Sequence, residues 1–331
     1  MSVTVRSFAK INLGLRIGAR RADGFHELLT VYQTIGLHDL IGVSVGRGRG
    51  IEIRCSDPRV PTDESNTCYR IVEKTLHALK AKGHVVIDIE KRLPVEGGLG
   101  GASANAVAAL LALERVLNKS LDAEERLRIA AEVGSDLPLF LVGGTVLGMG
   151  RGEQVYPLQD LPAMVCVVVL PKVGVSTAKA FAEWDRKLTV PEPSDRMIEL
   201  GRGLSAWLSK GYSGAPRFSA RGLTDQPMRG RRENPLLELV RAGIKNDFEE
   251  VVFPEYPELS EGKKALERAG AKYASLSGSG SALYGLFYSK ESASKEAAQG
   301  TVAKLRRQGW TVQTTVTLTR RQYWAKFSVS G

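Results

Sequence analysis

Residues 94–105 read Pro94-Val95-Glu96-Gly97-Gly98-Leu99-Gly100-Gly101-Ala102-Ser103-Ala104-Asn105, and residues 106–113 continue as Ala106-Val107-Ala108-Ala109-Leu110-Leu111-Ala112-Leu113. Four glycines within five positions disfavour any regular element, whereas the alanine- and leucine-rich run behind them favours a helix. Such a loop can place several backbone N–H groups against a ligand, and the helix adds unpaired amides and the positive end of its dipole. The segment therefore predicts a phosphate cradle; a flexible loop before a buried helix is the alternative.

Two common phosphate-binding patterns do not fit this loop. No Lys-Ser or Lys-Thr pair follows the last glycine, as the Walker type of loop requires. The Gly98-Leu99-Gly100 core lacks the third glycine and the acidic partner of a dinucleotide fingerprint. The loop is therefore predicted to be a phosphate loop of another type.

The pattern Pro-x-x-Gly-Gly-Leu-Gly-Gly-x-Ser-x-Asn-Ala resembles the ATP loop of the GHMP kinases, the superfamily of galactokinase, homoserine kinase, mevalonate kinase and phosphomevalonate kinase. Where the superfamily commonly has Gly, Gly and Ser, this chain has Glu96, Ala102 and Ala104, and Glu96 adds a negative charge near the expected phosphates. The resemblance implies that Mg²⁺ accompanies ATP with Ser103 as a ligand. It implies ATP contacts from Pro94, Gly97, Gly98, Leu99, Gly100, Gly101, Ala102, Ser103 and Ala104.

A lysine interrupts the apolar pattern of the first predicted strand, residues 3–19. The period of two places Lys10 and Asn12 on one face of that strand. A buried lysine is costly unless its charge meets an anion, so from the pattern alone Lys10 is expected to reach the surface. The GHMP kinases carry Ala-Lys-Ile-Asn-Leu here, and this resemblance implies a catalytic Lys10 and a substrate-binding Asn12.

The second motif is Gly134-Ser135-Asp136-Leu137-Pro138-Leu139-Phe140. Asp136 stands where a short helix is expected to begin, so a helix cap is the structural interpretation. In the GHMP kinases the corresponding aspartate faces the acceptor hydroxyl, which implies a catalytic Asp136. A carboxylate beside the Lys10 ammonium would stay ionised and could orient or deprotonate an alcohol, so the two residues are predicted to meet in the fold.

Aromatic residues are predicted at the acceptor site. Phe25 and His26 follow an Asp23-Gly24 turn and could simply fill the core of a hairpin. The resemblance instead implies that they bind cytosine, with Phe181 closing the other side of the ring; the superfamily often has Tyr at the position of Phe25. Ser176 and Thr177, expected to cap the helix that contains Phe181, are implied to contact the substrate.

Length and composition favour two domains. A chain of 331 residues exceeds the size at which one core usually stops growing, and a composition shift near residue 161 predicts domains 1–160 and 161–331. The resemblance implies an α+β fold, with an N-terminal ribosomal-protein-like βαβ domain and a C-terminal ferredoxin-like domain. The glycine turn at 277–281 is expected to form a second wall around the triphosphate. The match omits residues 190–232, and Pro216–Arg232 is predicted to be an insertion.

Composition also restricts partners and location. The longest apolar run, residues 163–170, is too short to span a bilayer, and no charged-then-apolar leader precedes residue 3, so a cytoplasmic protein is expected. Three irregularly spaced cysteines favour neither a disulfide framework nor zinc. The net charge of +10 is not arranged as a basic stripe with interleaved aromatics, so no nucleic-acid partner is expected. A monomer or a homodimer is expected.

These features together predict an ATP-dependent small-molecule kinase. The resemblance implies transfer of the γ-phosphoryl group to the 2-hydroxyl of a cytidine diphosphate derivative of a methylated tetritol, in the non-mevalonate route to isoprenoid precursors. Homoserine or mevalonate kinase activity is the first alternative. A non-catalytic nucleotide- or RNA-binding protein of this fold is the second, and the presence of both Lys10 and Asp136 argues against it.

Overall fold

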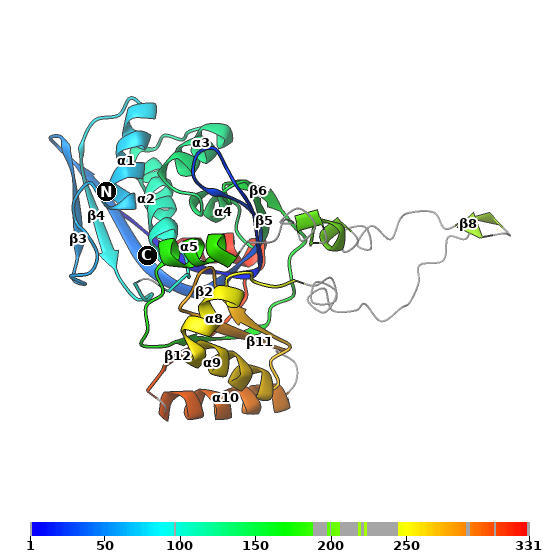
Figure 1. Cartoon of the computed structure of the whole chain (residues 1–331). Helices are drawn as coiled ribbons and strands as arrows, with labels where there is room; N and C mark the ends of the chain where they lie inside the picture. The colour runs from blue at the N-terminus through cyan, green and yellow to red at the C-terminus, as the bar shows by residue number, and fades with distance from the viewer. Residues whose placement is uncertain are drawn as a thin grey trace.

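The computed structural model describes residues 2–95, 97–187, 197–198, 200–205, 218–219, 222–223, 244–288, 292–307 and 309–329. The orientation of Glu96 and most of the predicted insertion, Pro216–Arg232, lie outside these residues. Two large sheets, each with its own set of helices, and one short two-stranded sheet make up the described part of the chain (Figure 1). The predicted α+β class is therefore confirmed.

The first sheet is built around a long hairpin of two strands, β1 (Ser2–Arg20) and β2 (His26–Gly46). The hairpin turns at Gly24, whose φ of 86° is a left-handed conformation that glycine adopts readily. β2 also pairs with β4 and β5, while β3 joins β4 in parallel. The remaining strands are β3 (Gly50–Cys55), β4 (His84–Glu90), β5 (Thr145–Met149) and β6 (Gln154–Pro157).

Four helices accompany this sheet: α1 (Thr67–Ala78), α2 (Gly101–Leu117), α3 (Ala123–Val133) and α4 (Leu137–Val142). The helix predicted after the glycine loop is α2. Its small alanines allow it to lie close to the hairpin, and ten of its residues are buried. α1 ends at Ala78. α3 starts after Asp122, whose side chain accepts from the Glu125 amide.

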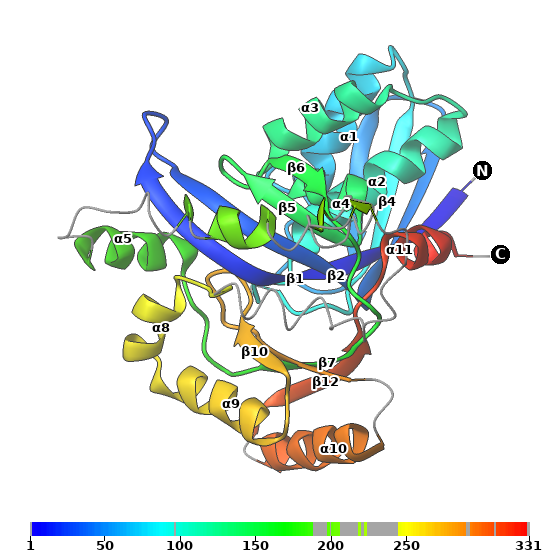
Figure 2. The same cartoon turned by 90° about the vertical axis from the view of Figure 1, so that its right-hand side faces the viewer.

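The second sheet is antiparallel, in the order β10-β11-β7-β12. It comprises β7 (Val165–Leu170), β10 (Tyr273–Leu276), β11 (Leu283–Phe287) and β12 (Thr311–Val316). Its helices are α5 (Thr177–Lys187), α8 (Glu249–Glu255), α9 (Pro257–Arg268) and α10 (Ser292–Arg307), and Figure 2 shows this unit beneath the long hairpin. Residues 197–198 and 200–205 are helical, and β8 (Phe218–Ser219) pairs with β9 (Gly222–Leu223).

The last element of the described chain is a helix, α11 (Arg320–Phe327), that was not predicted from the sequence. Thr319 and Gln322 form a reciprocal capping box at its start, and this Thr-x-x-Gln spacing was the available signal. α11 returns to the first sheet, where the Tyr323 hydroxyl donates to the Phe140 carbonyl at 2.8 Å and Val5 bridges to Ser328.

The predicted domain boundary at residue 160 falls between the last strand of the first sheet and the first strand of the second, and it stays a proposal. No helix in the described part of the chain is both long and apolar enough to cross a membrane.

Candidate active site

The glycine loop is held between the first strand and the glycine turn that joins β10 to β11. The Lys10 amide donates to the Leu99 carbonyl at 2.9 Å, and the Ser277 hydroxyl donates to the Gly98 carbonyl at 2.8 Å. A Cβ atom on Gly98 would lie 2.1 Å from the Ser277 carbonyl oxygen, so only glycine allows this approach. Gly100, at φ 70°, is the last residue before α2. The predicted loop therefore opens the helix and contacts both sheets' units.

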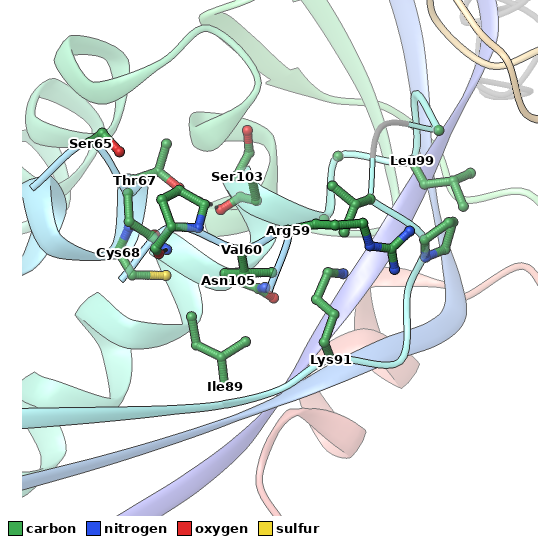
Figure 3. A pocket seen from close by; sticks show the side chains of 18 of the residues that line it. Arg59, Val60, Ser65, Thr67, Cys68, Ile89, Lys91, Leu99, Ser103 and Asn105 are labelled. Atoms are coloured by element: carbon green, nitrogen blue, oxygen red, sulfur yellow. Dashed lines mark hydrogen bonds between the residues drawn. The ribbon is translucent and has the colours of Figure 1, made fainter. Parts of the chain in front are cut away.

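A pocket of about 370 Å³ lies along this loop, a size typical of small-molecule sites (Figure 3). The glycine loop and Ser103 line it together with the apolar side chains of Val60, Pro61 and Ile89. The predicted residues that line it are Pro94, Gly97, Gly98, Leu99, Gly100, Gly101, Ala102 and Ser103. Ala104 is not among the lining residues, because it faces the core and is buried in α2. Backbone amides of the loop beside apolar side chains suit a nucleotide, which has a charged and an aromatic part.

Several pocket residues were not identified from the sequence. Arg59, Thr67 and Lys91 line the pocket, and they come from a loop, a helix start and a strand end that carry no recognisable pattern. Cys68 also lines it; burial, and secondarily the nearby charge of Asp39, raises the pKa of its thiol to about 12. The thiol is therefore neutral and behaves as a small apolar group.

Lys10 and Asp136 come together as predicted. The Lys10 ammonium lies 3.4 Å from Asp136 Oδ2 and donates to Asn12 Oδ1 at 2.6 Å. Asn12 in turn donates to the Thr30 hydroxyl at 2.8 Å, so both ends of its amide are used. Lys10 is 3% exposed and does not reach the surface, in contrast to the expectation from its pattern alone. Its charge is offset by the Asp136 carboxylate.

Asp136 stands at the start of α4 but does not cap it, because its side chain makes no hydrogen bond to the helix amides. Its Oδ1 accepts from the Tyr32 hydroxyl at 2.9 Å. Burial, followed by the negative charge of Asp136, raises the pKa of Tyr32 well above its usual value, so this hydroxyl is a permanent donor near neutral pH. Tyr32 was missed from the sequence, since a tyrosine in a buried strand is usually core.

The second glycine turn faces the same ammonium. A Cβ on Gly278 would lie 3.6 Å from Lys10 Nζ, and a Cβ on Gly100 would lie 3.0 Å from Lys10 Cγ. Asn246 fixes this turn by donating to the carbonyls of Leu276 and Gly278 at 2.9 and 2.8 Å. Lys10 is thus placed between two glycine turns.

The aromatic residues are arranged differently from the expectation that Phe25 and Phe181 enclose one ring. His26 stacks on Phe181, with centroids 4.9 Å apart and planes 8° from parallel, and its Nε2 is 2.6 Å from Asp185 Oδ1. Phe25 is 51% exposed and has the Arg151 guanidinium over its ring at 5.0 Å. Phe25 lies in the turn before β2, whereas His26 is the first residue of that strand.

The predicted residues at the start of α5 lie at the edge of this region. The Thr177 and Ser279 hydroxyls are 2.7 Å apart, which links α5 to the second glycine turn. Ser176 is exposed, and its hydroxyl accepts only a long, 3.4 Å hydrogen bond from the Lys179 amide. Among the described residues, no group of three or more His, Cys, Asp or Glu side chains could hold a metal ion.

Two family models match the chain: GHMP kinases N terminal domain over residues 66–144, and GHMP kinases C terminal over residues 231–308. The chain is 39% identical over 283 residues to 4-diphosphocytidyl-2-C-methyl-D-erythritol kinase of Solibacter usitatus, which covers 86% of this chain and 80% of that protein. It is 34% identical over 309 residues to the kinase of the same name from Acaryochloris marina, covering 89% and 90% of the two chains.

Solved structures give the same result. A crystal structure of 4-(cytidine 5'-diphospho)-2C-methyl-D-erythritol kinase superposes with a TM-score of 0.68 at 28% identity and covers 96% of this chain and 99% of that chain. Homoserine kinase from Cytophaga hutchinsonii superposes with a TM-score of 0.67 at 21% identity, covering 96% and 95% of the two chains. The second likeness shows a shared fold alone.

Proposed function

The chain belongs to the 4-diphosphocytidyl-2-C-methyl-D-erythritol kinases, a family of the GHMP kinases, and from this membership we propose the reaction that its cleft performs. The protein is an ATP-dependent small-molecule kinase that phosphorylates the 2-hydroxyl of 4-diphosphocytidyl-2-C-methyl-D-erythritol in the non-mevalonate route to isoprenoid precursors. The observation that supports the site most strongly is the Lys10–Asp136 pair, placed between two glycine turns.

Asp136 is the proposed group that acts on the acceptor. The hydroxyl oxygen bonds to the γ-phosphorus of ATP, the bond from that phosphorus to the β–γ bridging oxygen breaks, and ADP leaves. The hydroxyl proton passes to the Asp136 carboxylate, which Tyr32 holds through Oδ1 and Lys10 through Oδ2. Phosphoryl transfer depends mainly on alignment and charge neutralisation, and the enclosed Lys10 ammonium can supply both to the transferred group.

The glycine loop and the second glycine turn are the proposed binding walls for the triphosphate. Both present backbone groups at glycines, where no side chain shields them, and α2 begins directly behind the first. Ser103 is the proposed protein ligand of Mg²⁺, since it lines the pocket beside the loop. One hydroxyl suits an ion that is held chiefly by substrate phosphates and water. When bound, Mg²⁺ would offset the phosphate charge.

The cytosine site is proposed at the stacked pair of His26 and Phe181. These rings offer apolar faces, and His26 offers a polar edge fixed by Asp185. Asn12, whose amide accepts from Lys10 and donates to Thr30, supports the substrate by holding Lys10. Ser176 and Thr177 lie at the start of α5, where they can contact the diphosphate.

An acceptor panel tests this proposal. Purified protein is supplied with ATP and Mg²⁺ and with the cytidine diphosphate derivative, homoserine or mevalonate in turn, and ADP release is measured. Turnover with the cytidine derivative alone is expected, because the two small acids carry no ring for the aromatic site. Efficient turnover of either acid would reassign the substrate. Acceptor-independent nucleotide binding with no ADP release would favour a non-catalytic binding protein.

A further inference from the structure

A short segment, residues 245–249, leads into α8 and joins β1 to the second glycine turn at residues 277–281. Two of its side chains, Asn246 and Asp247, are polar and yet only 2% and 1% exposed. A buried polar side chain is costly unless it is hydrogen-bonded, so the partners of these two residues indicate what the segment holds in place. Their partners lie on two different elements of the proposed active site.

One side of the segment is bound to β1. Asp247 Oδ1 accepts from Arg16 Nη1 at 2.7 Å, and its Oδ2 accepts from the Ile17 amide at 3.0 Å. The backbones pair as well, because the Leu15 amide donates to the Lys245 carbonyl at 2.8 Å and the Asp247 amide donates to the Leu15 carbonyl at 2.9 Å. Breaking a buried ion pair would leave an uncompensated charge, which is strongly unfavourable. The segment is therefore fixed to the strand that carries Lys10.

The other side of the segment is bound to the glycine turn. Asn246 donates from Nδ2 to the Leu276 carbonyl at 2.9 Å and to the Gly278 carbonyl at 2.8 Å. Its Oδ1 accepts from the Phe248 amide at 3.1 Å, so the orientation of the side-chain amide is set within the segment itself. Asparagine suits this position because its NH₂ group supplies both donors, whereas an aspartate would present acceptors to two carbonyls.

The position of the turn matters because Gly278 faces the Lys10 ammonium. A Cβ on Gly278 would lie 3.6 Å from Lys10 Nζ and 3.8 Å from the Gly98 carbonyl oxygen. The turn, the ammonium and the first glycine loop thus border the same small space. Phosphoryl transfer depends on alignment, and a displacement of about 1 Å can cost a hundredfold in rate.

We propose that Asn246 is a positioning residue of the triphosphate site. It holds the second glycine turn against the Lys10 ammonium, and Asp247 anchors Asn246 to the strand that carries Lys10. The segment sets the distance between two walls of the site that belong to different sheets. This inference rests on the proposed function, because it takes the two glycine turns to be the walls around the triphosphate.

The Asn246→Asp variant tests this role with almost no change of shape. One carboxylate oxygen can still accept from the Phe248 amide, but the other faces the Leu276 and Gly278 carbonyls and repels them. Even a protonated carboxyl has one hydrogen, so at most one of the two carbonyls keeps its partner. The turn is therefore expected to move away from Lys10.

Two ligands that share a base make the readout specific to the turn. Affinity for a non-hydrolysable ATP analogue should fall about tenfold or more in Asn246→Asp. Affinity for AMP should change little, because AMP has no β- or γ-phosphate to meet the turn. Isothermal titration with Mg²⁺ and without acceptor measures both, and the ratio of the two dissociation constants is the quantity compared. Asn246→Ala removes both donors without adding a negative oxygen, so it should change the ratio in the same direction by a smaller factor.

Tyr273→Phe is the matched control. The Tyr273 hydroxyl donates to the Leu13 carbonyl at 2.7 Å, so it also joins the second sheet to β1, but through β10 rather than through the turn. Its loss should lower stability and keep the wild-type ratio of the two dissociation constants. A merely structural role of Asn246 would give the same result as this control.

A folded Asn246→Asp protein with the wild-type ratio, or with equal losses for the ATP analogue and AMP, would overturn the proposal. If circular dichroism shows that Asn246→Asp does not fold, Asn246→Ala decides the matter by the same ratio. Failure of the proposed function is detected separately, because a wild-type protein that releases no ADP with any acceptor still gives both dissociation constants.

Discussion

The ammonium of Lys10 lies 3.4 Å from Oδ2 of Asp136, and the two side chains differ sharply in exposure, at 4% and 34%. The lysine is enclosed, so its charge must be offset by neighbouring anions. The carboxylate is partly open, so an acceptor can reach it. This asymmetry supports a division of labour, in which Lys10 neutralises charge and Asp136 acts on the incoming hydroxyl.

Asp136→Asn should bind nucleotide almost as the wild type does and lose about two to four orders of magnitude in kcat, the range typical of a lost general base. An amide cannot take the hydroxyl proton, although it keeps the shape of the carboxylate. Steady-state kinetics and calorimetry with a non-hydrolysable ATP analogue measure the two effects. A variant of full activity would leave Asp136 with a structural role.

Lys10→Met should remove most turnover and keep the fold. The methionine stem fills a similar volume, but Asn12 Oδ1 loses its donor, so we expect a stability loss of about 1–3 kcal/mol. Circular dichroism and urea unfolding check the fold, and the kinase assay checks catalysis. An active, folded Lys10→Met enzyme would contradict the proposed charge neutralisation.

Tyr32→Phe should lower kcat about tenfold with little change in KM for ATP, because it removes one charge-assisted hydrogen bond from Asp136. The ring remains in place beside Lys10. If Tyr32 only packed in the core, its loss would change the melting temperature and leave kcat unchanged, so both are measured.

The sequence predicted those elements whose structure depends on residues that are close together in the chain. The glycine loop, α2 behind it and the glycine turn between β10 and β11 depend on residues that are adjacent in sequence, and all three were found. Lys10 and Asp136 were paired only through the family resemblance, because no periodicity connects β1 with the start of α4.

The missed residues take their roles from tertiary contacts. Tyr32 lies in β2 and Asn246 lies before α8, and their importance comes from partners at the start of α4 and in the second glycine turn. The contact of Phe25 with the cytosine stays a prediction, because in the structure its exposed ring packs with Arg151 and no acceptor is bound. The burial of these side chains and the directions in which they point had to be known before their roles could be assigned.

Stability should fall as the pH rises above about 10, the pKa of tyrosine in an unfolded chain. Burial raises the pKa of each of four tyrosines in the fold: Tyr32, Tyr273, Tyr284 and Tyr323. Below pH 10 these tyrosines are protonated in both the folded and the unfolded state, so their ionisation does not lower the free energy of unfolding. Above it, only the unfolded state loses protons, at about 1.4 kcal/mol per pH unit for each tyrosine until the folded pKa is reached.

Urea unfolding at several alkaline pH values measures this slope, and ultraviolet absorbance follows tyrosine ionisation. Tyr32→Phe should reduce the slope, whereas Tyr156→Phe should not, because Tyr156 is 51% exposed. If all four buried tyrosines ionised before the protein unfolded, as shown by tyrosinate absorbance, burial would not be raising their pKa values.

The stacked pair of His26 and Phe181 should decide acceptor binding. Phe181→Ala removes a ring that stacks on His26 and makes an edge contact with Phe248, in both cases with centroids 4.9 Å apart. A base–aromatic contact contributes about 1–3 kcal/mol, so KM for the cytidine diphosphate derivative should rise roughly 10- to 100-fold, with a smaller change for ATP. Phe25→Ala is the matched control, since its exposed ring packs with Arg151 rather than with Phe181. A smaller effect at Phe25 than at Phe181 is expected. Equal effects would indicate that Phe25 and Phe181 enclose the cytosine from two sides in the bound state. No effect of Phe181→Ala would place the cytosine elsewhere.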